Sequence, residues 1–161
     1  MIKLKNILNE VMSHNEIQKI IDAVYPQIVK DLGGQAKPTE IHNNIYKRIG
    51  AVAAEDLMKQ NNPDAQYDPD DDVIYIYSSK MKTVEDVIRS LLHEHTHTLQ
   101  DQKKFKQIYA DGALYDNHPY EKEADKAEVG WKKYATTLNE MDFGKVLFGR
   151  GVADDGSGQY K

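Results

Sequence analysis

The sequence predicts an α+β fold that is mainly helical, with a small β-sheet or a single edge strand. Apolar residues recur at helical spacing along most of the chain. One run, residues 73–77, is instead rich in β-branched and aromatic residues and is bounded by turn residues, as strands are. A third observation, two histidines and a glutamate at helical spacing in residues 93–97, predicts that one helix carries a metal site.

Composition limits what such a domain can do. The 161 residues suit one compact domain, and the net charge of −5 gives no support to nucleic-acid binding. Because the chain has no cysteine, any metal must be held by histidine and carboxylate. We see no apolar run long enough for a membrane and no signal peptide in residues 1–6. We therefore expect a cytoplasmic protein without a membrane partner.

The first 34 residues are expected to form helices. Residues 2–12 have an amphipathic pattern, and Ser13 with Glu16 makes a capping box that starts a second helix at residue 14. Pro26 is expected to kink or split that helix. This region has no cluster of polar residues that could form a site. We therefore interpret it as scaffold or, alternatively, as a docking surface for a partner protein.

The next third of the chain is expected to hold a helix and then the strand. Residues 39–60 are predicted to be helical, although Ile45 and Ile49 are β-branched and part of the segment could be a strand. The acidic run 68–72 lacks the spacing of a calcium loop and is interpreted as a solvated turn. Strand 73–77 is either an ordinary structural strand or an edge strand that pairs with an extended substrate.

The predicted metal helix starts at a capping box formed by Thr83 and Asp86 and is expected to reach about Gln107. His93 and His97 are about 40° apart around its axis and one turn apart along it, so both can bind one ion. Glu94 lies about 100° from His93, where a base can take a proton from metal-bound water.

His95, about 200° from His93, continues the apolar stripe of the same helix. We interpret it as a structural histidine and not as a ligand of the same ion.

A last helix, predicted over 119–139, can supply the third ligand. Glu121 lies in its first turn, and Asp125, one turn on, could accept a hydrogen bond from a ligating histidine. Glu123 is the main alternative ligand, and His118 is a weaker one or a transition-state donor. Two further residues near the expected site, Tyr115 and Tyr120, could stabilise an oxyanion. Farther along this helix, the aromatic residues Trp131 and Tyr134 are expected to be core.

These motifs have a known counterpart. His93-Glu94-x-x-His97 followed by Glu121-x-x-Ala124-Asp125 resembles the gluzincin metallopeptidases, particularly their very small single-domain members. The resemblance covers about residues 65–138. It implies a zincin-like fold and one zinc ion per chain, with ligands His93, His97 and Glu121, base Glu94 and outer-shell Asp125.

We expect a single zincin-like domain at residues 1–148, with the metallopeptidase core at 65–138 and with N-terminal helices at 1–34 that the resemblance does not explain. A short final helix is expected near 143–148. The Gly- and Asp-rich residues 149–161 are expected to be a flexible tail.

The function that follows is a zinc-dependent peptidase acting on a peptide or protein substrate. Zinc would lower the pKa of its fourth ligand, a water molecule, and Glu94 would move the proton to the leaving amine. Two alternatives use the same residues. One is a non-catalytic zinc-binding protein with a role in assembly or interaction, and the other is a metal-dependent hydrolase of non-peptide amides or esters.

Overall fold

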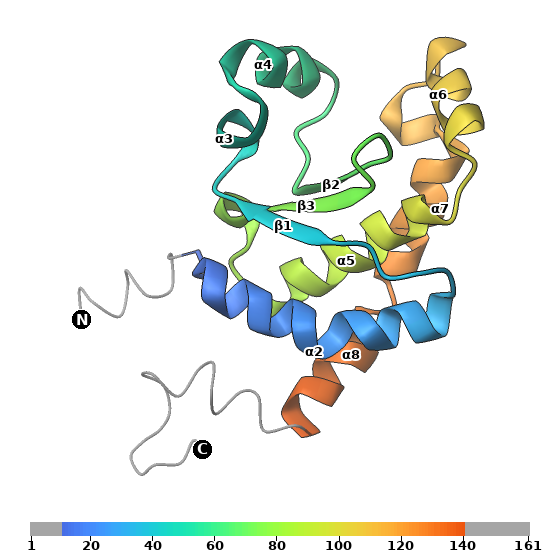
Figure 1. The fold of residues 1–161 in the computed structure, drawn as a ribbon. Coiled ribbons are helices and arrows are strands. Elements are labelled where there is room, and N and C mark those ends of the chain that lie inside the picture. Colours follow the sequence, from blue (N-terminus) through green and yellow to red (C-terminus); the bar gives the residue numbers. More distant parts are fainter. Residues whose placement is uncertain (1–10, 141–161) are drawn as a thin grey trace.

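The computed structural model describes residues 11–140. It is mainly helical with one three-stranded sheet, which confirms the α+β class (Figure 1). The first and last helices expected from the sequence, at 2–12 and 143–148, and the tail 149–161 lie wholly or largely outside the described residues. Within the described part of the chain, no helix is long and apolar enough to cross a membrane.

Helix α2 (His14–Leu32) begins as the sequence predicts. The Ser13 hydroxyl accepts from the Glu16 amide, and the Glu16 carboxylate accepts from the Ser13 amide. The expected split at Pro26 does not occur, since α2 continues through this residue to Leu32. Its apolar face, from Ile17 to Ile28, is buried in the main core.

The helix expected over residues 39–60 is wrong at its start. Residues Thr39–His42 form strand β1, and two short helices follow, α3 (Ile45–Ile49) and α4 (Ala51–Gln60). Asn44 caps α3 by accepting from the Lys47 amide, and Gly50, at φ 87°, separates the two helices.

The sheet has the strand order β1-β3-β2, with β2 at Ala65–Asp68 and β3 at Val73–Tyr77. β3 pairs in parallel with β1 and antiparallel with β2. It is therefore the central strand and is buried throughout, so of the two alternatives for residues 73–77 the edge strand is wrong and the ordinary structural strand is confirmed. The edge strand that lies against the metal helix is β2.

Helix α5 (Val84–Thr98) has the expected capping box at Thr83 and Asp86. It ends about nine residues earlier than predicted, because Asp101 accepts from the Lys104 amide and starts a new helix, α6 (Gln102–Ala110). Short 3-10 turns occur at Ser78–Lys80 and Tyr115–Asn117.

The helix predicted over residues 119–139 is two helices, α7 (Pro119–Glu128) and α8 (Trp131–Glu140). The chain leaves the helical path at Val129 and Gly130, where glycine lowers helix stability. Tyr134 is buried in the core and Trp131 packs against it, which confirms the expected structural role of both rings.

Helix α5 is the centre of the fold. It contacts α2 and α8 on one side, while β2 and α7 contact it elsewhere (Figure 1). Its residues Val87, Ile88, Leu91 and Leu92 are buried in the same cluster as the apolar face of α2. The histidine-bearing surface of α5 is therefore held on a rigid element, as a precise site requires.

Candidate metal centre

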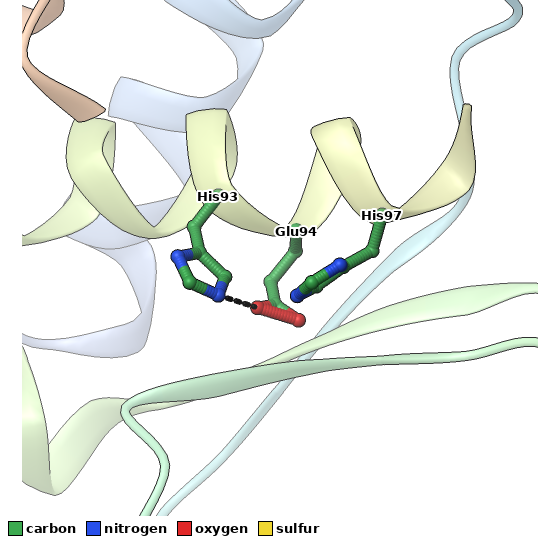
Figure 2. Close-up of side chains that lie close together, drawn as sticks. All are labelled: His93, Glu94 and His97. Carbon is green, nitrogen blue, oxygen red and sulfur yellow. Dashed lines mark ion pairs between the residues drawn. The ribbon is translucent and has the colours of Figure 1, made fainter. Parts of the chain in front are cut away.

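The site is built on α5. Figure 2 shows His93, Glu94 and His97 projecting from one side of this helix toward a common point. Ligand atoms from these three buried side chains lie within 4.8 Å of one another, so the group could hold a metal ion. The spacing of four residues places the two imidazoles one turn apart, with ring centroids separated by 4.7 Å.

Glu121 joins these residues from α7. Its Oε1 lies 3.3 Å from His93 Nε2 and 3.0 Å from His97 Nε2. Ala124, fully buried on the same helix, allows α7 to approach α5 closely. The alternative third ligand, Glu123, points elsewhere and accepts a hydrogen bond from Gln100. The structure thus places Glu121, and not Glu123, beside the two histidines.

The outer nitrogens of the two histidines are also engaged. His93 Nδ1 lies 2.8 Å from Glu128 Oε2 and 3.3 Å from Asp125 Oδ1. His97 Nδ1 lies 2.7 Å from the amide oxygen of Gln100. Since carboxylate and amide oxygens only accept, both Nδ1 atoms carry the proton, and a neutral ring then presents a lone pair at Nε2.

This arrangement fits a metal ion. Each Nε2 faces the Glu121 carboxylate, and only a proton or a cation between the two atoms makes that contact favourable. Two atoms bound tetrahedrally to one zinc at about 2.0–2.2 Å lie roughly 3.3–3.5 Å apart, close to the observed separations of 3.3 and 3.0 Å. Two histidines and one carboxylate, with no thiolate, are a ligand set of catalytic zinc.

The electrostatics agree with a cluster that attracts positive charge. Burial alone would lower the pKa of His93, but its hydrogen bonds to Glu121 and Glu128 outweigh this effect and raise the pKa to about 10. Burial would raise the pKa of Glu121, yet hydrogen bonds to both histidines hold it well below its ordinary value. Burial raises the pKa of Glu94, which makes this carboxylate a stronger base.

Glu94 is also held by the sheet. The backbone N–H of Tyr67, on β2, donates to Glu94 Oε1 over 2.7 Å. The other oxygen, Oε2, lies 3.8 Å from His93 Nε2, on the side where the ligand atoms converge. One oxygen therefore fixes the side chain, and the other faces the point where the ligand atoms converge.

A cleft of about 650 Å³ contains this group. Its lining comes from α5, from the edge strand β2 and from the loop before that strand, residues 61–64. Phe105 and Tyr109 of α6 and residues 113–115 also line it. The candidate metal ligands are thus accessible to a molecule that enters the cleft.

Two tyrosines border the centre. Tyr115 was expected there, and its hydroxyl lies 3.5 Å from His93 Nε2 and 3.2 Å from Asp125. Tyr109 was not expected, and its hydroxyl donates to Glu121 Oε2 over 2.8 Å. Tyr109 lies four residues after Phe105, so both rings are on one face of α6, but the helix predicted from the sequence ends at about residue 107, before Tyr109.

His118 and Tyr120 lie away from the centre. His118 is fully buried, with Nε2 donating to the Phe105 carbonyl and Nδ1 accepting from the Tyr120 amide. Nδ1 therefore caps α7 and Nε2 ties it to α6, so both ring nitrogens are used and this histidine is structural. The Tyr120 ring packs against Phe105 and His118, and it is not part of the cleft lining among the described residues.

The acidic run 68–72 makes contacts that fit the predicted turn. Asp68 accepts from the amides of Asp70 and Asp71, and Asp72 pairs with Lys37. Within the part of the chain that the structure describes, this run does not form a group of metal-ligating geometry.

We compared the chain with protein-family models, curated proteins and solved structures, and none of them matches it.

Proposed function

We propose that this protein is a zinc-dependent peptidase of the gluzincin type with a zincin-like fold. The observation that carries the proposal is the position of Glu94. This buried carboxylate lies beside two histidines and Glu121 and inside an open cleft. A metal site that only stabilised the fold would not need a base at this position.

Zinc, when bound by His93, His97 and Glu121, would supply Lewis acidity, which activates water at neutral pH and polarises the scissile carbonyl. Glu94 Oε2 takes the proton from the attacking water and delivers it to the departing amine. The Tyr67 amide keeps Oε1 in place during both transfers.

Tyr115 is the best-placed donor to the oxyanion that forms on the carbonyl oxygen when water adds to the carbonyl carbon. Its hydroxyl is on the Nε2 side of His93, where the ligand atoms converge. Burial, together with the nearby charges of Glu121 and Asp125, raises its pKa far above the ordinary value, so the phenol remains a donor at neutral pH.

The edge strand β2 supports a peptide as substrate. It pairs with β3 along one edge only, and it also contacts α5. Residues 65–67 line the cleft, and the Tyr67 N–H already points at Glu94. An extended peptide can add to this edge through main-chain hydrogen bonds, which would bring its scissile bond to Glu94.

The test is Glu94→Gln in zinc-loaded protein. We expect the variant to keep its zinc and to lose cleavage of a broad peptide library by about 10²–10⁴-fold, the usual contribution of a general base. Zinc is measured by mass spectrometry of the metal, and cleavage by mass spectrometry of the products. Glu123→Gln, an exposed carboxylate of α7, is the matched control and should cleave as the wild type does.

Two results would refute the proposal. One is a Glu94→Gln variant that cleaves at the wild-type rate. The other is a zinc-loaded wild type that cuts no peptide, which would favour a non-catalytic zinc protein. Release of products from amides or esters without peptide cleavage would favour the third function considered above.

A further inference from the structure

Two carboxylates from α7 compete for the outer nitrogen of His93. The Glu128 contact is a hydrogen bond of 2.8 Å, whereas Asp125 lies at ion-pair distance, 3.3 Å. The sequence suggested Asp125 for this role, because it follows Glu121 by one turn. Glu128 follows Asp125 by three residues and therefore lies on the same face of α7.

The surroundings of the two carboxylates differ as well. The Asp125 side chain is 51% exposed, and its Oδ1 also accepts from the Tyr115 hydroxyl. The Glu128 side chain is 25% exposed. Water competes less for Glu128, so its hydrogen bond to His93 is the stronger of the two.

Arg89 holds the second oxygen of Glu128. Its guanidinium lies 3.5 Å from Glu128 Oε1, while Glu128 Oε2 contacts His93. Arg89 is itself fixed by Glu85, one turn earlier on α5, through a bond of 2.7 Å. Arg89 and His93 are four residues apart on one face of α5, so Glu128 spans two successive turns of that helix.

From these contacts we propose that Glu128, held by Arg89, is the positioning residue for His93 and that Asp125 contributes little to this role. Glu128 fixes the protonated Nδ1 and the ring orientation, so that the Nε2 lone pair is directed at the metal. This inference rests on the metal-binding part of the proposed function and not on its peptidase part.

The test compares matched truncations, Glu128→Ala and Asp125→Ala, by zinc affinity in competition with a chelator. We expect Glu128→Ala to weaken zinc binding by about 10–100-fold, as loss of an outer-shell partner does, and Asp125→Ala by less than about threefold. Glu128→Gln keeps an acceptor oxygen and should recover part of the loss. Arg89→Met should weaken binding to a smaller extent than Glu128→Ala.

A spectroscopic readout separates positioning from a general loss of structure. In the zinc-loaded wild type, the Nδ1 proton of His93 should resonate far downfield, since it is donated to a carboxylate. This signal should shift or broaden in Glu128→Ala and remain in Asp125→Ala, while the rest of the amide spectrum is unchanged in both. Equal losses of affinity in the two variants, or a greater loss in Asp125→Ala, would overturn the inference.

A further outcome concerns stoichiometry, because His93, Asp125 and Glu128 form a second group of metal-ligating geometry. Two zinc ions per chain, one of them lost in Glu128→Ala, would make Glu128 a ligand and overturn the positioning role. A wild type without any zinc affinity would overturn this inference and the proposed function together. A wild type whose zinc affinity is lost in His97→Ala but unchanged in Glu128→Ala would overturn this inference alone.

Discussion

The two faces of α5 use the same residue type for opposite purposes. On the cleft face, His93 and His97 direct Nε2 at the Glu121 carboxylate. On the core face, His95 is fully buried, accepts at Nδ1 from the Tyr25 hydroxyl, and donates from Nε2 to the Gly33 carbonyl. Two residues of sequence separate a proposed metal ligand from a structural histidine.

The element that packs on each face explains this difference. Helix α7 brings carboxylates, which outweigh burial and raise the pKa of His93 and of His97. Helix α2 and the residues after it bring a phenol and a carbonyl to His95, whose pKa is lowered by burial. His95 therefore stays neutral in the core, while the cleft face gathers positive charge. The role of each histidine on α5 is therefore set by the helix that packs against its face.

The largest expected effect comes from removing the carboxylate opposite the cleft face. Glu121→Ala should weaken zinc binding by more than about 100-fold, because loss of even an outer-shell partner costs about 10–100-fold. The matched variant Glu123→Ala, on the same helix and exposed, should bind zinc within about threefold of the wild type, since Glu123 acts only through Gln100. Metal content after dialysis and chelator competition measure both. Equal zinc affinity in the two variants would remove the distinction between the faces.

The residues that lie together on the cleft face of α5 could be placed from the sequence. The spacing of His93 and His97 is a local feature of one helix. Glu121 could be chosen because it lies in the first turn of the next predicted helix, α7. The elements between them were harder to predict. Asp101 is one polar residue inside an otherwise helical pattern. The hydrogen bond by which it caps α6 forms only because the chain changes direction there, and the pattern does not indicate this change. The β-branched residues of 39–42 join the sheet because β3 lies beside them.

The contacts across the cleft could not be predicted from the sequence either. Tyr67 reaches Glu94, and Glu128 reaches His93, over separations of 27 and 35 residues. Each depends on how two elements pack and on no local spacing. Strand 73–77 was recognised as a strand, but its central place in the sheet depends on β1, which had been predicted as helix.

A smaller effect is expected on the core face. His95→Ala should lower the free energy of unfolding by about 2–4 kcal/mol, because it leaves a cavity and removes the partners of the Tyr25 hydroxyl and the Gly33 carbonyl. Urea unfolding in the presence of a chelator measures this without a contribution from bound metal. At low temperature, the folded variant should still bind one zinc ion per chain. Unchanged stability with lost zinc would place His95 in the metal site instead.

The smallest effect concerns the helices that cover the core face. Asp31 of α2 accepts from Lys133 and from the Tyr134 hydroxyl of α8, both at 2.7 Å, and these bonds lower the pKa of Asp31. A carboxyl with a lowered folded-state pKa stabilises the fold above its unfolded pKa of about 4 and loses this contribution as the pH falls through the folded value. The stability difference between the wild type and Asp31→Asn should therefore be constant between about pH 5 and 7 and shrink in acid. Urea unfolding at several pH values measures it. Because Asp31 is on the surface, solvent screening keeps the difference well below that of His95→Ala, and a difference that grew in acid would contradict the pairing of α2 with α8.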